Sequence, residues 1–233
     1  MATISENIQQ LHGRIERACK QASRPVQSVT LLVVSKTFPA EEVRLAFAAG
    51  ERRFGENYVQ EGLEKIAQLA DLRDQIEWHL IGPLQSNKTR VVAEHFDWVH
   101  SVDRLKIAQR LSEQRPAHLP PLQVCLQVNI SGEASKSGLA PAQAQDLAHA
   151  VAALPRLRLR GLMAIPEPAL DLQAQREPHR ALAQLLRQLQ EQGLTLDTLS
   201  MGMSADMDAA ILEGATLVRV GSAIFGQRPT TGA

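Results

Sequence analysis

The sequence predicts a single TIM-type (β/α)8 barrel with an extra N-terminal helix, and three observations support this fold class. First, the chain has 233 residues, a length at which one α/β barrel forms a single domain, here spanning residues 1–233. Second, short apolar segments alternate with amphipathic ones, as in right-handed βαβ units with a parallel sheet. Third, the first apolar segment, Val29–Lys36, is nearly all apolar or β-branched, which is typical of a strand buried on both faces.

The elements are expected in a regular order that begins with an amphipathic helix over Ile4–Gln21. The expected strands are Val29–Lys36, Arg53–Asn57, Ile76–Gly82, Trp98–Val102, Leu122–Asn129, Leu157–Ile165, Leu196–Met201 and Thr216–Val220. The helices expected between them are Ala40–Ala49, Val59–Leu72, Asn87–His95, Asp103–Gln114, Pro141–Leu154, Glu177–Gln192 and Ala205–Glu213. Eight such units close naturally into a barrel, and an open doubly wound sheet is the competing arrangement. The proline-rich connection Ile165–Pro178 is the segment expected to be most mobile.

The charge and composition argue against several classes of function. The 25 basic side chains balance 25 acidic ones, so the chain lacks the basic field that nucleic-acid or membrane-surface binding usually needs. Aromatic residues make up only 3% of the chain, too few for stacking platforms, and the histidine spacing fits no metal motif. The charged segment Met1–Lys20 resembles no secretory signal, which predicts a cytoplasmic protein with Cys19 and Cys125 reduced and buried.

Lys36 ends the first apolar strand, where barrels place their functional side chains. Leu32, Val34 and Lys36 share one face of this strand because side chains alternate along it. If that face is inward, burial lowers the lysine pKa from about 10.4 and favours the neutral amine that attacks carbonyl groups. The alternative is a lysine that extends from the strand end into solvent.

Three further strands place candidate residues near the same end of the barrel. Asn57 ends the second strand and is able to donate or accept hydrogen bonds. His79 on the third strand is suited to stack on a ring or bond to it, and its alternative role is that of a satisfied core histidine. Met163 on the sixth strand is suited to lie against a ring face, and core packing is its alternative role.

The last two strands lead into segments suited to an anion. Ser200 ends the seventh strand, and Ser204 follows it as a helix N-cap or as part of an anion site at a helix N-terminus. Gly221 and Ser222 follow the eighth strand and are able to present two successive backbone N–H groups to a phosphate. Barrels commonly bind phosphate in the loops that follow these two strands.

Arg219 lies within the buried eighth strand and needs an acceptor, because its charge cannot be titrated away. It is expected to form either a structural ion pair or a hydrogen bond to a ring nitrogen of a ligand. An arginine in the second role donates a hydrogen bond but no proton. A pyridine nitrogen then stays unprotonated, and the ring becomes a weaker electron sink.

These residues lie in segments that resemble the YggS/PROSC family of pyridoxal phosphate-binding proteins. The matching segments are VSKTFP (Val34–Pro39), FGENYVQE (Phe54–Glu61), WHLIGPLQSNK (Trp78–Lys88), VNISGEASKSG (Val128–Gly138), GLMAIP (Gly161–Pro166), SMGMSADMDAAI (Ser200–Ile211) and VRVGSAIFG (Val218–Gly226). They follow one another in order across nearly the whole chain. Ser222 stands where many relatives have Thr, which keeps a hydroxyl group at this position.

The resemblance implies the barrel fold of the alanine racemase N-terminal domain, with pyridoxal 5'-phosphate as the bound cofactor. It implies a Schiff base on Lys36 and a hydrogen bond from Arg219 to the pyridine nitrogen. It places the remaining candidates at the phosphate (Ser200, Ser204, Gly221, Ser222) and around the ring (Asn57, His79, Met163). The family carries or buffers the cofactor, which implies a part in vitamin B6 homeostasis and in amino-acid and keto-acid balance without catalysis.

Two functions of different class remain open on the sequence: a cofactor carrier, which the resemblance favours, and a racemase-like enzyme acting on amino acids. Racemisation needs two bases, one on each face of the substrate. Lys36 serves one face, and the only tyrosine, Tyr58, is a poor second base. A phosphate-binding barrel without a covalent cofactor is a third possibility. The carrier is expected to be monomeric and to serve apoenzymes that need the cofactor, with Lys136 as the alternative anchor.

Overall fold

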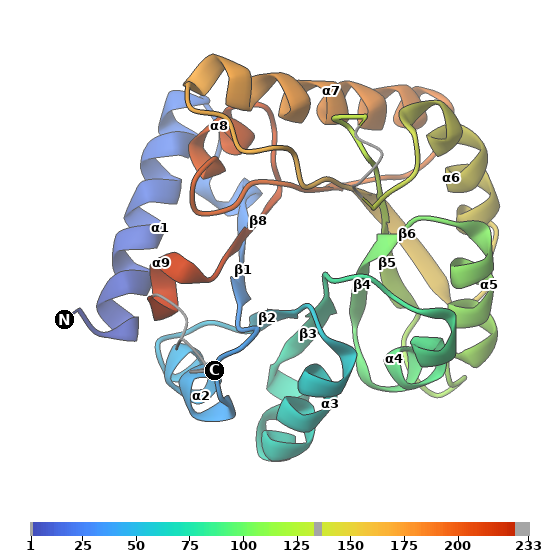
Figure 1. Cartoon of the computed structure of the whole chain (residues 1–233), viewed down its shortest axis with the longest axis horizontal. Coiled ribbons are helices and arrows are strands. Elements are labelled where there is room, and N and C mark those ends of the chain that lie inside the picture. The colour runs from blue at the N-terminus through green and yellow to red at the C-terminus, as the bar shows by residue number, and fades with distance from the viewer. Residues whose placement is uncertain (1, 133–136, 227–233) are drawn as a thin grey trace, which may run out of the picture.

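A computed structural model of the chain describes residues 2–132 and 137–226. Within these residues, eight parallel strands form a closed barrel in chain order, and helices surround it (Figure 1). The strands are β1 (Thr30–Val34), β2 (Arg53–Glu56), β3 (Glu77–Leu80), β4 (Trp98–Val102), β5 (Leu122–Gln127), β6 (Leu157–Met163), β7 (Thr198–Ser200) and β8 (Leu217–Val220). Since β8 pairs with β1 and closes the ring, the predicted (β/α)8 barrel is confirmed and the open sheet is excluded.

The helices lie outside the barrel, and the extra N-terminal helix is among them. The α-helices are α1 (Ile4–Gln21), α2 (Ala40–Ala48), α3 (Val59–Gln68), α4 (Thr89–His95), α5 (Leu105–Gln114), α6 (Ala144–Ala152), α7 (Leu172–Glu191), α8 (Met207–Leu212) and α9 (Ser222–Phe225). Short 3-10 helices are η1 (Val26–Ser28), η2 (Ala70–Gln75), η3 (Ser86–Lys88) and η4 (Pro141–Gln143). A capping box between Thr3 and Glu6 begins α1 and explains why this helix starts where its apolar stripe does.

Several element boundaries differ from the prediction, and two differences have a clear local cause. Helix α7 begins at Leu172 rather than Glu177, because the Asp171 side chain accepts a hydrogen bond from the Ala174 N–H and caps the helix earlier. Pro178 therefore lies inside the helix, and the expected loop Ile165–Pro178 is shorter than predicted. The short helix α9 was not predicted, since a four-residue helix leaves no periodic pattern in the sequence.

The residues of β1 divide between two apolar clusters, and this division fixes the inward face of the strand. Leu31 and Val33 belong to the large cluster between the sheet and the helices. Leu32 and Val34 belong to a small cluster with Ile81 and Leu217, inside the barrel. Because side chains alternate, Lys36 continues the inward face just beyond the strand. The structure therefore shows that this face, whose orientation the sequence left open, is the inward one.

None of the helices in the described part of the chain is long and apolar enough to span a membrane. Across residues 2–132 and 137–226, no group of His, Cys, Asp and Glu is arranged to hold a metal ion. Cys19 and Cys125 are both free and buried, as predicted. Burial raises the pKa of the Cys125 thiol to about 12, which makes this residue a core side chain rather than a nucleophile.

Candidate functional site

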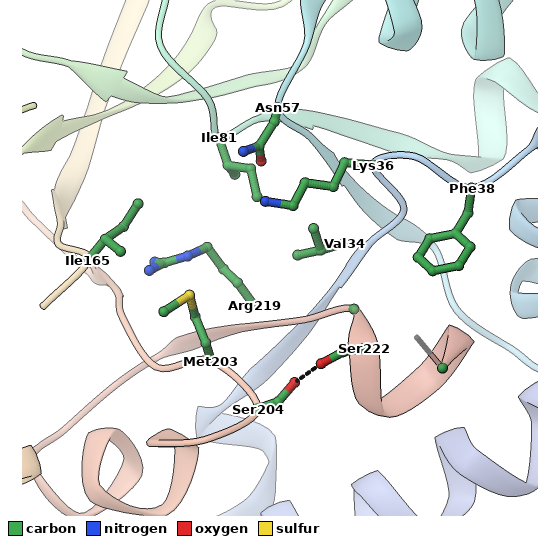
Figure 2. A pocket seen from close by; sticks show the side chains of 12 residues that line it. Val34, Lys36, Phe38, Asn57, Ile81, Ile165, Met203, Ser204, Arg219 and Ser222 are labelled. Atoms are coloured by element: carbon green, nitrogen blue, oxygen red, sulfur yellow. Dashed lines mark hydrogen bonds between the residues drawn. The ribbon is translucent and has the colours of Figure 1, made fainter. Parts of the chain in front are cut away.

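A cavity of about 580 Å³ opens at the C-terminal end of the barrel strands (Figure 2). This volume lies within the range typical of small-molecule and cofactor sites. The residues that line it come from the ends of β1, β2, β3, β6, β7 and β8: Val34, Lys36, Phe38, Asn57, Ile81, Ile165, Met203, Ser204, Arg219, Gly221, Ser222 and Gly226. Among the residues predicted from the sequence, the structure therefore brings together Lys36, Asn57, Ser204, Arg219, Gly221 and Ser222.

Lys36 lies in the turn directly after β1 and is half-buried. Figure 2 shows its side chain extending from this turn into the cavity, beside Ile81 and Asn57. The apolar side chains of Val34 and Ile81 form the nearby cavity wall. The structure thus places the lysine in the cavity rather than on an outer surface, which decides between the two orientations considered from the sequence.

One corner of the cavity is built from hydroxyl groups and backbone at the ends of β7 and β8. The hydroxyl oxygens of Ser204 and Ser222 lie 3.2 Å apart across this corner (Figure 2). Ser222 begins α9, whose first backbone N–H groups have no acceptor within the helix. Ser204 is not the N-cap of α8, because Asp206 occupies that position. The corner therefore offers hydrogen-bond donors to an anion.

Gly221 is required by close packing at this corner. A Cβ atom at this position would lie only 2.6 Å from the carbonyl oxygen of Val34 on β1. Any side chain there would force β8 and β1 apart at the mouth of the barrel. Gly221 thus allows the phosphate-type turn to sit directly against the strand that carries Lys36.

Helix α1 supports both segments of this corner from outside. The Arg14 guanidinium donates to the Ser204 carbonyl over 2.8 Å and to the Asp208 carboxylate over 3.0 Å. The Asn7 amide donates to the Ile224 carbonyl in α9 over 2.8 Å. These bonds link the extra N-terminal helix to the segments that hold Ser204 and Ser222.

The Arg219 guanidinium is buried at the base of the cavity, with only 4% of the residue exposed. It donates to the hydroxyl of Ser200 over 2.7 Å and to the carbonyl of Ala164 over 2.8 Å. Burial lowers the arginine pKa to about 10, which leaves the side chain charged at neutral pH. Because no described carboxylate pairs with Arg219, the ion-pair alternative is excluded for the described residues. Arg219 is also among the residues that line the cavity.

A chain of hydrogen bonds continues below Arg219 through the inside of the barrel. The Ser200 hydroxyl lies 2.8 Å from His100 Nδ1, and His100 Nε2 lies 2.8 Å from His79 Nδ1. His79 Nε2 in turn lies 2.9 Å from the Glu77 carboxylate at the opposite end of the strands. The five side chains therefore connect the cavity with the N-terminal face of the barrel.

The direction of donation along this chain is fixed from both ends. Burial lowers the pKa values of His79 and His100, so both rings are neutral and each carries one proton. Burial disfavours the charge of Glu77, but the His79 hydrogen bond and the nearby positive charge of Arg53 outweigh it and hold the carboxyl pKa below its ordinary value. Since arginine only donates and the carboxylate only accepts, each ring carries its proton on Nε2.

Three predicted site residues lie outside the cavity lining. His79 and Ser200 are fully buried members of the hydrogen-bond chain beneath Arg219. Met163 is fully buried in a small cluster with Trp98 and Cys125. Direct contact of these residues with a ring or phosphate in the cavity is therefore not what this arrangement favours, because none of the three lines the cavity. Lys136 lies outside the described residues.

Several cavity residues were missed from the sequence. The apolar wall includes Phe38, Ile165 and Met203, which follow strands β1, β6 and β7. Val34 and Ile81 were detectable in principle, since Val34 shares the face of Lys36 and Ile81 follows β3 directly. Phe38 packs on Phe225 with ring centroids 4.8 Å apart, a contact between distant segments that has no local sequence signal.

Comparison with known proteins supports the family resemblance. Residues 7–229 match the model of the alanine racemase N-terminal domain. The chain is 64% identical to the pyridoxal phosphate homeostasis protein of Pseudomonas aeruginosa over 98% of this chain and 97% of that protein. It is 54% identical to the protein of the same name in Escherichia coli, over 98% of each chain.

Solved structures agree with this relationship. PipY of Synechococcus elongatus, solved with pyridoxal phosphate (PLP) bound, is similar at a TM-score of 0.79 and 40% identity, over 91% of this chain and 99% of that chain. Alanine racemase of Corynebacterium glutamicum shares only the fold, at a TM-score of 0.68 and 18% identity, over 95% of this chain and 62% of that chain. The chain therefore belongs to the family of pyridoxal phosphate homeostasis proteins, whose barrel matches the alanine racemase N-terminal domain.

Proposed function

We propose that this protein binds pyridoxal 5'-phosphate as a carrier or buffer, in a Schiff base with Lys36. The observation that carries the proposal is the grouping of one amine, one guanidinium and a hydroxyl-lined corner around a single cavity. The cofactor has an aldehyde, a pyridine nitrogen and a phosphate, and each has a chemical complement among these groups. The PLP-bound structure of PipY and the names of the bacterial relatives support this assignment.

Each proposed contact follows from the chemistry of the side chain. Lys36 supplies the amine that condenses with the aldehyde and releases water. Ser204, Ser222 and the backbone at Gly221 supply hydrogen-bond donors for the phosphate. Arg219 donates to the pyridine nitrogen, and Asn57 borders the ring. His79, Met163 and Ser200 support the site from beneath instead of touching the cofactor.

A non-catalytic role is favoured by the groups around the cavity. Among the described residues that line it, Lys36 is the only side chain able to take up a proton from a substrate carbon. Tyr58 is 59% exposed and lies outside the lining. Arg219 donates a hydrogen bond without releasing its proton, which weakens the ring as an electron sink. Both features favour holding the cofactor over transforming amino acids with it.

Replacement of the proposed anchor is the first prediction. Lys36→Ala should fold but lose the visible absorbance of the Schiff base, because Lys36 supplies the only amine among the described residues that line the cavity. Any cofactor held by the phosphate corner alone should bind at least about tenfold more weakly than in the wild type. The measurement is an absorbance titration, with exposed Lys88→Ala as the control. Undiminished Schiff-base absorbance in Lys36→Ala would place the anchor on another lysine.

The racemase-like alternative is tested separately. Exchange of the α-protons of a panel of amino acids is followed in deuterium oxide by NMR with cofactor-loaded protein. We expect no exchange at enzyme-like rates, whereas sustained turnover would overturn the carrier function. We further propose that the barrel acts as a single domain in a cytoplasmic monomer that supplies apoenzymes.

A further inference from the structure

Behind the Lys36 turn lies a buried cluster of charged side chains that the proposed function does not use. It consists of Glu56 at the end of β2 and of Glu61 and Lys65 in α3, and it is called here the anchor cluster. We propose that the anchor cluster positions Lys36 for Schiff-base formation by holding the backbone on both sides of it. This inference rests on the proposed Schiff base and concerns how its amine is presented.

Lys65 is the centre of the anchor cluster. Its ammonium group donates to the Ser35 carbonyl over 2.6 Å, to Glu56 Oε1 over 2.8 Å and to Glu61 Oε1 over 2.7 Å. All three of its protons therefore have acceptors. Only 5% of the Lys65 side chain and none of the Glu56 side chain is exposed. Because Lys65 and Glu56 are buried, water does not compete for the bond between the Lys65 ammonium group and the Ser35 carbonyl, as it would at the surface.

The cluster binds the residue before Lys36 twice. Besides the bond from Lys65 to its carbonyl, Ser35 donates from its hydroxyl to Glu56 Oε1 over 2.6 Å. Ser35 itself is fully buried. These two bonds fix both the backbone and the side chain of Ser35 at the start of the turn.

The cluster also binds the residue after Lys36. The backbone N–H of Thr37 donates to Glu61 Oε1, the same oxygen that accepts from Lys65. Thr37 has a φ angle of +69°, in the left-handed region that a β-branched residue rarely adopts. The bond to Glu61 offsets the unfavourable conformation of Thr37. With both neighbours held, the direction in which the Lys36 side chain leaves the turn is fixed.

The charged composition of the anchor cluster indicates a role other than stabilising the fold. Two carboxyl groups face one ammonium group, and Glu56 Oε2 has no hydrogen-bond partner among the described residues. Apolar residues of similar volume often stabilise a fold at least as well as a buried ion pair. The charged groups instead supply directed hydrogen bonds to the turn. Because the turn is already ordered, Lys36 loses less conformational entropy when it binds an aldehyde.

The test uses Glu61→Ala, because this carboxylate lies at the partly exposed edge of the cluster. The variant removes the acceptor for the Thr37 N–H and should weaken Schiff-base formation with pyridoxal phosphate about tenfold. The control is Glu64→Ala, an exposed residue of the same helix that bonds only to Gln60 among the described residues. The readout is the equilibrium constant from an absorbance titration, with thermal unfolding measured alongside.

Two further measurements distinguish a positioning role of Glu61 from a general loss of stability: a second-site rescue and a comparison of two ligands. Thr37→Gly in the Glu61→Ala background should restore most of the binding, because glycine adopts positive φ without support. Pyridoxal, which lacks the phosphate, should lose affinity by the same factor as pyridoxal phosphate. If Glu61→Ala fails to fold, Glu61→Gln with and without Thr37→Gly takes its place, with a smaller loss and the same rescue expected.

The inference is overturned if the Glu61 variants bind both ligands as Glu64→Ala does. It is also overturned if Thr37→Gly brings no recovery. Failure of the proposed function looks different: wild-type protein would then form no borohydride-stable adduct on Lys36 at all, and the inference would fall with it.

Discussion

At the scale of single residues, the protonation states of Arg219 and Glu77 at the two ends of one hydrogen-bond chain are fixed by their surroundings. Arg219 is held by two neutral oxygens and stays protonated despite its burial. Below it, Ser200, His100 and His79 relay hydrogen bonds to the Glu77 carboxylate. Because an arginine ends the chain, no proton can pass through it to the cavity. The chain therefore fixes the orientation of Arg219 rather than conducting protons.

The fixed direction of this chain gives a spectroscopic prediction. His79 and His100 should both be neutral at pH 7 with the proton on Nε2, since Nδ1 of each ring accepts a hydrogen bond. Nitrogen-15 NMR of labelled histidine measures the tautomer directly. The partly exposed His12, whose pKa is raised chiefly by its hydrogen bond with Glu51, is an internal reference for a ring that protonates as the pH falls. A protonated Nδ1 on either buried ring would contradict the assigned direction.

Glu56 gives a prediction for stability against pH. Burial raises the pKa of Glu56 from 4.5 to about 7, although Lys65 and Ser35 favour its charged form. The folded protein then binds this proton more tightly than the unfolded chain. The stabilising contribution of Glu56 to the free energy of unfolding is fully present below pH 4.5 and is lost as the pH rises to about 7. Its total change is roughly 3 kcal/mol, from a shift of this size.

The measurement is urea unfolding of the wild type and of Glu56→Gln at pH 5 and pH 7.5. The difference between the two free energies of unfolding isolates Glu56 from the histidines, which titrate in the same range. We expect the wild type to lose stability relative to the variant as the pH rises. If the free energies of unfolding of the wild type and Glu56→Gln differ by the same amount at pH 5 and pH 7.5, the buried carboxyl does not titrate between these pH values.

At the scale of elements, helix α1 acts as a support for the phosphate corner. It lies beside α8 and α9 in Figure 1, and its Arg14 and Asn7 bond to the backbone of Ser204 and Ile224. Its buried face, with Ile8, Leu11 and Ile15, packs into the large apolar cluster and holds the helix in place. The helix that precedes the barrel therefore contributes to the cavity without lining it.

This support predicts an effect that depends on the phosphate. Arg14→Met removes the bond to the Ser204 carbonyl and should weaken binding of pyridoxal phosphate about tenfold. Binding of pyridoxal should not change, because it has no group for this corner. Arg17→Met, at an exposed position of the same helix, is the control. Equal losses for both ligands would mean that Arg14 acts on the barrel as a whole.

At the scale of the whole molecule, strand order explains why distant residues meet in one cavity. Parallel closure brings the ends of β1 and β8 side by side, with Leu32 paired to Arg219 and Val33 to Val220. Lys36 and the Gly221 turn therefore become neighbours although nearly the whole chain separates them. Figure 1 shows this closure between the two strands.

Periodicity in the sequence was sufficient for the barrel and for the grouping of Leu32, Val34 and Lys36 on one face of β1, because both depend on local alternation. Periodicity does not show how far along a strand an inward residue lies from the cavity. His79 and Ser200 point into the barrel as cavity residues do, yet both are fully buried and neither lines the cavity. The anchor cluster was also missed, because Glu56, Glu61 and Lys65 look like ordinary helix and strand-end charges until packing buries them.

Reduction followed by peptide mapping tests whether Lys36 holds the cofactor covalently. The purified protein is loaded with pyridoxal phosphate, treated with borohydride, digested and analysed by mass spectrometry. We expect one dominant modified peptide, with the reduced cofactor on Lys36, and no such peptide from Lys36→Ala. A dominant adduct on another lysine, or protein that takes up cofactor without any reducible bond, would contradict this expectation.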